Sequence, residues 1–153
     1  MIIRKMTIED YEQVYNIWLE SGNGLNDIDD AKPGIEKFLR RNPDTCFVAL
    51  DGETIIGTIL SGHDGHRGRI SHTAVLASER KKGVGTALVN AALDALTAEG
   101  ITKVNLLVFA HNAPGNKFWE SMGFKSRDDV VYRDRALIEV KRLNDNFNFI
   151  ERK

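Results

Sequence analysis

The stretch from Ile70 to Phe109 constrains the fold more than any other part of the chain. An apolar run is followed by the glycine-containing sequence RKKGVG, by a helical pattern between Thr86 and Glu99, and by the β-branched run KVNLLVF. Gly100 stands where a helix commonly ends, and the apolar residues at helical spacing are Leu88, Ala92, Ala95 and Leu96. Strand, helix and strand in this order predict a right-handed crossover between two parallel strands.

The strands before this unit are expected to be antiparallel. The runs CFVAL and TIIGTIL flank the turn Asp51-Gly52, which is typical of a hairpin, and MIIRKM predicts a further short strand at the start of the chain. A last strand is expected over ALIEVKRL, residues Ala136–Leu143. The predicted fold class is therefore α/β, with a mixed, mostly antiparallel central sheet, one parallel β-α-β unit and helices on both faces.

Three helices are expected outside the crossover. Thr7 can cap the first one, with Asp10 three residues on, and apolar residues follow at helical spacing at Tyr11, Val14, Tyr15 and Trp18. A polar, acidic loop over Asn26–Asp30 leads to a second helix, opened by Pro33 and closed by the pair Asn42-Pro43. The third runs from the region 112–114 to Met122.

Length, charge and cysteine content bound the class of protein. The 153 residues suit one domain, which we expect over residues 1–143, with a polar tail over 144–153. The 21 basic and 22 acidic side chains form no long basic run, which argues against a nucleic-acid partner. No apolar run reaches about 18 residues, and the single Cys46 cannot form an intramolecular disulfide. A cytoplasmic protein that does not enter a membrane is therefore expected.

The sequence RKKGVGTAL, Arg80–Leu88, stands where the first strand of the crossover passes into its helix. The first N–H groups of a helix have no partner inside it and lie at the positive end of the helix dipole, so anions bind there. Gly83 and Gly85 would let this backbone approach a pyrophosphate, the three cations add charge and Thr86 adds a hydroxyl. A tight turn with solvated basic residues is the alternative for the nonapeptide alone.

Two common phosphate-binding loops do not fit this stretch. The sequence contains no G-x-x-x-x-G-K-[ST] string, which excludes a P-loop. Leu88 occupies the third glycine position of the dinucleotide fingerprint G-x-G-x-x-G, and the preceding strands are expected to be antiparallel rather than linked by crossovers. Both nucleotide-binding hypotheses are weakened as a result.

A second motif, NAPGNKFWESMGF over residues 112–124, gives the junction its context. Together with Arg80-x-x-Gly83-x-Gly85 it resembles the GNAT superfamily of N-acetyltransferases, whose patterns are [QR]-x-x-G-x-[GA] and, further along the chain, N-x-x-A-x-x-[FL]-Y-E-x-x-G-F. The residues that fall on the second pattern are Asn112, Phe118, Glu120, Gly123 and Phe124. GHDGHRG and DDVV also resemble a small bacterial branch of this superfamily, a likeness that names no substrate.

The resemblance implies acetyl-CoA as cosubstrate and direct attack of a bound amine on its thioester, with no acylated side chain and no metal. The pyrophosphate would lie on the amides between Arg80 and Thr86. The pantetheine arm would run between splayed strands ending near Val75 and Val108, and the Val75 amide could polarise the thioester carbonyl. The implied cofactor-binding residues are Val75, Leu76, Arg80, Lys81, Lys82, Gly83, Val84, Gly85, Thr86, Asn112, Phe118 and Trp119.

Three positions depart from the patterns of this family. Trp119 stands where many relatives carry the tyrosine that gives a proton to the thiolate, and an indole N–H does not titrate near neutral pH. Tyr132, water, or release of the thiolate into solvent are the alternatives for this acid. Gly115 replaces the patterned alanine, a change expected to be nearly neutral. Leu107 stands where relatives that acetylate protein N-termini often place an acidic base, which disfavours that substrate.

His72, on the strand approaching the cofactor, is the first candidate for the base that deprotonates the amine, because an imidazole titrates near neutral pH. His66, Asp64 and His111 follow. A surface or hydrogen-bonded structural role is the alternative for each histidine. The pair His63 and His66 lacks the two further ligands of a tetrahedral zinc site, so no metal is assigned.

Two other groups of residues have both a structural and a functional interpretation. Cys46 opens an apolar strand with no histidine beside it in sequence, which favours packing over an acyl-carrying role. Asp27, Asp29 and Asp30 could steer a cationic amine toward the protein, or could form only a solvated loop.

Three functions follow from these observations. We expect an acetyl-CoA-dependent N-acetyltransferase that acts on a primary amine of a small molecule or on a lysine-like side chain of a peptide. The missing tyrosine supports instead a regulatory module that binds acyl-CoA without catalysis. A binder of nucleotides or phosphometabolites is the third hypothesis. Dimers are common in this family, so the resemblance also allows a homodimer.

Overall fold

The computed structural model describes residues 1–145 of the chain. Its main sheet has the strand order β1-β3-β4-β5-β6. These strands are β1 (Ile2–Lys5), β3 (Phe47–Asp51), β4 (Thr54–His63), β5 (Gly68–Val75) and β6 (Val104–Leu106). Neighbours from β1 to β5 are antiparallel, whereas β5 and β6 are parallel. The predicted mixed sheet, with its antiparallel meander and one parallel crossover, is confirmed.

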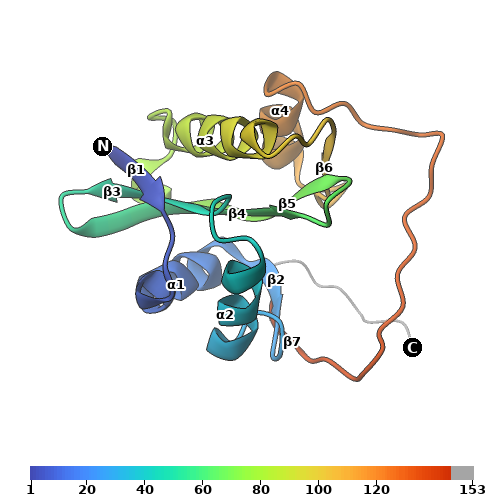
Figure 1. Cartoon of the computed structure of the whole chain (residues 1–153), viewed down its shortest axis with the longest axis horizontal. Helices are drawn as coiled ribbons and strands as arrows, with labels where there is room; N and C mark the ends of the chain where they lie inside the picture. Colours follow the sequence, from blue (N-terminus) through green and yellow to red (C-terminus); the bar gives the residue numbers. More distant parts are fainter. Residues whose placement is uncertain (146–153) are drawn as a thin grey trace.

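Helices cover both faces of the main sheet (Figure 1). α1 (Tyr11–Ser21) and α2 (Lys32–Arg41) lie on one face, and α3 (Val84–Ala98) and α4 (Ala113–Ser121) lie on the other. Short 3-10 turns over Ile8–Asp10 and Ala77–Glu79 precede α1 and α3. All four helices are found where the apolar spacing and the capping signals predict them.

The sheet separates two apolar cores. Val14, Ile17 and Trp18 of α1 are buried on one side of it, together with Ile35 and Leu39 of α2. The core on the other side contains the buried residues Ile59, Ile70, Val84, Leu88, Val89 and Ala92, with the ring of Phe118 packed against it. Full burial of such an apolar side chain contributes about 1.5–3 kcal/mol. β4 is buried along most of its length because helices cover both of its faces.

An irregularity in the pairing of β4 with β5 changes the direction of side chains along β5. Ser71 and His72 stand together opposite Leu60, which is the arrangement of a β-bulge. As a result Ile70 packs in the core beneath α3, whereas Ala74 belongs to the core beneath α1. The pairing of β5 with β6 also ends at Ile70, so β5 leaves its parallel neighbour at the bulge.

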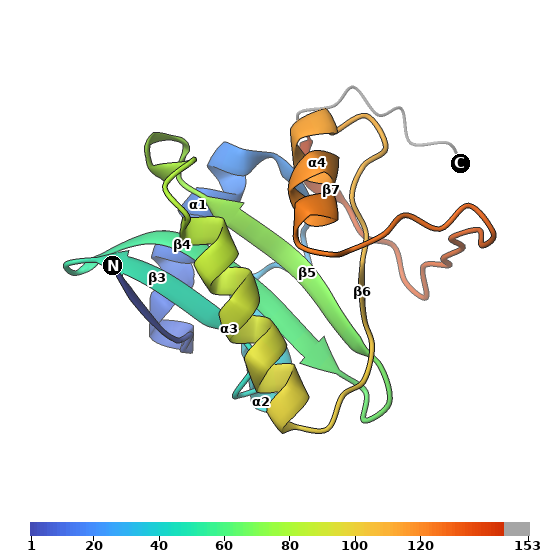
Figure 2. The same ribbon diagram turned by 90° about the horizontal axis from the view of Figure 1, so that it is seen from above.

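The two parallel strands are splayed beyond this point. β5 continues to Val75, while β6 ends at Leu106. Figure 2 shows the two chains separating from a common start, with α4 beside the open end. A gap between the backbones of parallel strands is therefore built into the sheet on the side where α3 begins.

The sequence does not predict a second, two-stranded sheet. β2 (Asn23–Asn26) pairs antiparallel with β7 (Arg142–Asp145) on the side of the molecule that carries α1 and α2. The predicted last strand over Ala136–Leu143 is wrong in position, since residues 136–141 form no strand. Two hydrogen bonds between Asp27 and Lys141 fix the register, so the strand begins only at the residue after Lys141. Most of the predicted tail, residues 146–153, lies outside the described residues.

Candidate functional site

The glycine junction forms a turn whose backbone amides are free at the start of α3. Lys81 has a φ of 63° and Gly83 a φ of 82°, so the chain is left-handed twice within three residues. Nothing lies within 4 Å of the position that a Cβ on Gly83 would take. The first bond inside the helix runs from the Ala87 N–H to the Gly83 carbonyl, at 3.1 Å. Among residues 1–145, no hydrogen-bond acceptor is found for the N–H groups of Val84, Gly85 and Thr86.

The cations of the junction are held only loosely. Arg80 donates through Nε to the Val75 carbonyl at 3.3 Å, and Lys82 lies 3.3 Å from the Glu79 carboxylate. Lys81 is exposed. Exposed ion pairs contribute about 0–1 kcal/mol, so an anion arriving at the start of α3 can compete for these side chains.

The end of β5 has a backbone edge that faces the gap. The Leu76 N–H donates to the Ile56 carbonyl at 2.9 Å and the Leu76 carbonyl accepts from the Glu79 N–H at 2.8 Å, so both Leu76 groups are used inside the chain. Backbone groups alternate in direction along a strand, so those of Val75 point away from β4. Of the two residues predicted to pair with the pantetheine arm, Val75 has the suitable orientation.

α4 packs beside the start of α3 through Phe118 and Gly85. A Cβ on Gly85 would lie 3.4 Å from the Phe118 ring, so the missing side chain allows the two helices to approach. Trp119 packs edge-on against Phe118 and Phe124, with ring centroids 5.0 and 5.2 Å apart. The structure therefore brings the two sequence motifs together. Gly85 packs against Phe118, whereas the Cβ position of Gly83 is unobstructed.

Asn112 caps α4 in a way that depends on Gly115. Its Oδ1 accepts a hydrogen bond from the Gly115 N–H at 3.0 Å. A Cβ on Gly115 would collide with the Asn112 amide group. An alanine at residue 115 would therefore require the Asn112 side chain to move, which the expectation of near equivalence did not include.

His72 lies at the bulge of β5 and is hydrogen-bonded to Asp30. Its Nε2 lies 2.6 Å from Asp30 Oδ1, and the two side chains are only 19% and 8% exposed. The other Asp30 oxygen accepts from the Asn26 N–H at 2.8 Å, and the His72 ring lies 4.8 Å from the Trp18 ring. An ionised carboxylate can only accept, so in this contact Nε2 is the donor and Nδ1 is the ring nitrogen that the contact leaves unused.

An open pocket of about 780 Å³ lies next to this pair. Its charged wall residues come from the β2–α2 loop, from α2 and from β5, and they are Asp29, Asp30, Lys37, Arg40, Arg41 and His72. A volume of this size is typical of sites for small ligands. Asp30 therefore lies in the pocket wall and contacts His72, rather than standing in a solvated loop or attracting an amine from a distance. Its position in the acidic loop of the sequence does not reveal this contact.

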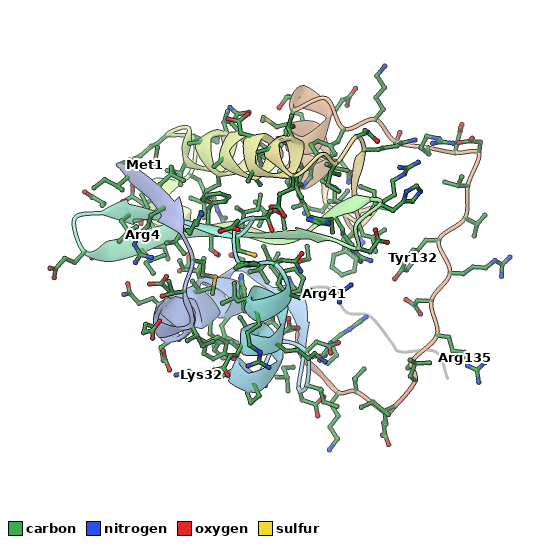
Figure 3. The ribbon with its side chains drawn as sticks, viewed as in Figure 1. Met1, Arg4, Lys32, Arg41, Tyr132 and Arg135 are labelled. Carbon is green, nitrogen blue, oxygen red and sulfur yellow. The ribbon has the colours of Figure 1, made fainter. Side chains whose placement is uncertain are left out.

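The other proposed acids and bases lie apart from His72. Tyr132 is 58% exposed on the extended segment between α4 and β7, which runs outside the body of the molecule (Figure 3). His63 is paired with Glu99 at 2.9 Å, at the end of α3 opposite to the glycine junction. His66 lies on the same hairpin. Asp64 accepts from the N–H groups of Arg67 and His66, which holds its pKa below the usual value and makes it a weaker base.

Two further residues have environments that limit their chemistry. The ring of His111 stacks on Phe109, at 5.5 Å between centroids. Cys46 is fully buried, and burial raises the pKa of its thiol to about 12, in accord with a packing role.

Among residues 1–145, no group of three or more histidine, cysteine or acidic side chains is placed to hold a metal ion. In the same part of the chain, no helix combines the length and apolar character that crossing a bilayer requires.

The structure places the free start of α3, the exposed edge of β5 and the pocket at His72 in one domain, and known proteins resemble this chain in sequence and fold. Residues 11–124 match the acetyltransferase (GNAT) family. The chain is 32% identical to an acetyltransferase of Sodalis glossinidius over 139 residues, which is 91% of this chain and 97% of that protein. An acetyltransferase of Yersinia pestis is 29% identical, with 91% and 98% of the two chains covered.

Solved structures show the same architecture. Ard1 from Thermoplasma volcanium superimposes with a TM-score of 0.72 at 26% identity, over 80% of each chain. PaiA N-acetyltransferase from Thermoplasma acidophilum, in complex with coenzyme A, gives a TM-score of 0.71 at 21% identity, over 83% of this chain and 91% of that one. From its motifs, its splayed sheet and these matches, the chain belongs to the GNAT family of acetyltransferases.

Proposed function

We propose that this protein transfers an acetyl group from acetyl-CoA directly to a primary amine. The observation that carries the proposal is the free start of α3 beside the Val75 edge of β5, where β5 and β6 separate. A diphosphate needs closely spaced N–H donors without a side chain in the way, and Gly83 provides that space. The protein that resembles this fold and contains coenzyme A supports the same cosubstrate here.

The remaining cofactor contacts follow from this placement. Arg80 and Lys82 would exchange their loose partners, the Val75 carbonyl and Glu79, for phosphate oxygens. Release of Arg80 would also free the Val75 backbone for the pantetheine arm, which would lie along β5 as an added strand. Phe118 and Trp119 would wall this channel from the side of α4.

The chemical step uses His72 as the base. The acceptor arrives as an ammonium and loses a proton to Nδ1 of His72. Its nitrogen then attacks the thioester carbonyl carbon and forms the C–N bond. The adduct gives the second nitrogen proton to water as the C–S bond breaks, which leaves the amide and the thiolate. The Val75 N–H would stabilise the negative charge that develops on the carbonyl oxygen. Asp30 would hold the imidazole in orientation and stabilise it once it is protonated.

The leaving group is the coenzyme A thiolate, and we propose that it is released without a tyrosine donor. Trp119 occupies the position of that residue, and Tyr132 lies on the outer segment. A thiol has a pKa of about 8.5, so a thiolate is a tolerable leaving group at neutral pH and can take its proton from water. An acyl-CoA-binding module without catalysis is the alternative function that Trp119 favours.

A thiol-release assay separates these two functions. The protein is mixed with acetyl-CoA and a panel of primary amines, and free coenzyme A is measured with a thiol reagent. Because Cys46 is buried, the folded protein should add little background to this signal. Amine-dependent release supports the transferase. Tight binding of coenzyme A without release for any amine would support the module instead.

A further inference from the structure

We infer that the acceptor is a primary amine that also carries an anionic group, a carboxylate or a phosphate, several bonds away from the nitrogen. The inference rests on the proposed function and names the class of substrate that the pocket between α2 and β5 selects. It is carried by the distribution of charge on the walls of that pocket.

One end of the pocket is negative. Asp30 is buried at this end, with Oδ1 2.6 Å from the His72 Nε2. Asp29 is adjacent on the β2–α2 loop, and its one side-chain partner among the described residues is the uncharged Asn26 amide, at 2.9 Å. An ammonium is attracted to this end, which His72 also lines.

The other end of the pocket is positive. Lys37, Arg40 and Arg41 line it from α2. Arg40 is paired with Glu36 at 2.9 Å. No ion-pair partner for Lys37 or Arg41 is found within residues 1–145. An exposed arginine without a carboxylate partner at the wall of a pocket is well suited to bind a carboxylate or phosphate through two parallel N–H groups.

The two ends are separated along the sheet. Asn42, the residue after Arg41, accepts through its side chain from the His63 N–H at 3.0 Å, which places the end of α2 at the end of β4. Asp30 instead meets β5 at His72, opposite Leu60. His63 lies three steps along β4 from Leu60, a rise of roughly 10 Å.

The part of the pocket that remains is apolar. Ile35, Phe38 and Leu60 also line it. Methylene groups between the amine and the anion of a substrate would contact such side chains. An amine without an anion would engage only the end at His72, and a compact α-amino acid would be too short to reach both ends.

The experiment compares matched acceptors in the thiol-release assay. Unbranched ω-amino carboxylates and ω-aminoalkyl phosphates of increasing length are tested against alkylamines of the same length and against glycine. We expect kcat/KM to be at least about tenfold higher for the longer anionic amines than for the neutral ones. The comparison of the carboxylate with the phosphate series identifies the anion.

A pair of variants locates the preference in the pocket. Arg41→Gln should lower kcat/KM at least about tenfold for the anionic amines only, with the KM for acetyl-CoA unchanged. Lys37→Gln should act in the same direction. Arg135→Gln removes the same charge from the outer segment and should change nothing (Figure 3).

Two results would overturn the inference. Equal turnover of charged and neutral amines would refute it while leaving the proposed transferase intact, and so would an effect of Arg41→Gln no larger than that of Arg135→Gln. Absence of turnover with every amine would instead contradict the proposed function, and the inference would fall with it.

Discussion

Gly83 combines a left-handed backbone with open space where a side chain would be. Alanine and aspartate at this position share the strain of the positive φ, about 1–2 kcal/mol, but only aspartate adds a negative charge beside the free amides. We expect Gly83→Asp to weaken coenzyme A binding at least about 100-fold and Gly83→Ala to weaken it much less. Isothermal titration calorimetry of both variants measures the difference.

Gly65 provides the matched control for this change. It also has a positive φ, 88°, and an open Cβ position, but it lies in the β4–β5 hairpin, at the opposite end of α3 from the glycine junction. Gly65→Asp should bind coenzyme A like the wild type. Wild-type affinity in a folded Gly83→Asp protein would show that the diphosphate lies elsewhere.

His72 tests the chemistry independently of cofactor binding. We expect His72→Asn to lower kcat about 100-fold, because a positioned base typically contributes that much, while the KM for acetyl-CoA stays unchanged. Added imidazole should restore part of the lost rate, since the neighbouring pocket is open. Steady-state kinetics with and without imidazole make the test. A histidine with only a structural role would show no such rescue.

Asp10 links the stability of the fold to pH. Burial opposes the ionisation of its carboxyl, but hydrogen bonds from Arg4 at 2.8 Å and from the Thr7 N–H hold its pKa below the usual value. A carboxyl with a lowered folded-state pKa stabilises the fold above its unfolded pKa and loses that contribution as the pH falls. Asp10→Asn should therefore lower the free energy of unfolding by about 1–2 kcal/mol at pH 7. The effect is no larger because Arg4 is partly exposed, so water screens its charge.

The difference in the free energy of unfolding between Asp10→Asn and the wild type should shrink once the pH falls below about 4, where the Asp10 carboxyl of the unfolded chain begins to be protonated. Urea denaturation at several pH values measures it. A difference that stays constant down to pH 2 would assign the stabilisation to packing rather than to the charge.

At the level of whole elements, the start of α4 depends on the contact between Asn112 and Gly115. An N-cap is worth about 1 kcal/mol, and a methyl group on residue 115 would displace the capping side chain. Gly115→Ala should therefore destabilise the protein by about 1 kcal/mol in denaturant unfolding. In the Asn112→Ala background the same change should be neutral or stabilising. An equal cost in both backgrounds would remove Asn112 from the explanation.

Most of the elements that local sequence signals predict are found in the structure. The turn Asp51-Gly52 and the apolar spacing between Val84 and Ala98 specify a hairpin and a helix from neighbouring residues alone. β2 and β7 lack such signals. The sequence of β2, NGLN, contains one apolar residue, and its pairing with Arg142–Asp145 depends on contacts between distant parts of the chain. The strand predicted over Ala136–Leu143 is misplaced because this distant pairing, and not the local apolar run, sets where β7 begins.

At the level of the whole molecule, the meeting of the two motifs could be predicted from the sequence, whereas the pairing of His72 with Asp30 could not. The glycine junction and the α4 motif are short, and they meet because a crossover brings consecutive elements together. Asp30 and His72 are 42 residues apart and meet only after α1 and the β2–α2 loop pack on the sheet. The charges on α2 belong to the same pocket, although nothing in their spacing points to it.

The proposed function requires that the start of α3 and the edge of β5 hold acetyl-CoA through its diphosphate. Calorimetric titration of the wild-type protein with coenzyme A and, separately, with pantetheine, which has the same thiol arm but no phosphate, tests this directly. We expect one binding site for coenzyme A and an affinity for pantetheine at least about 100-fold lower. Equal affinities, or no binding of coenzyme A, would contradict it.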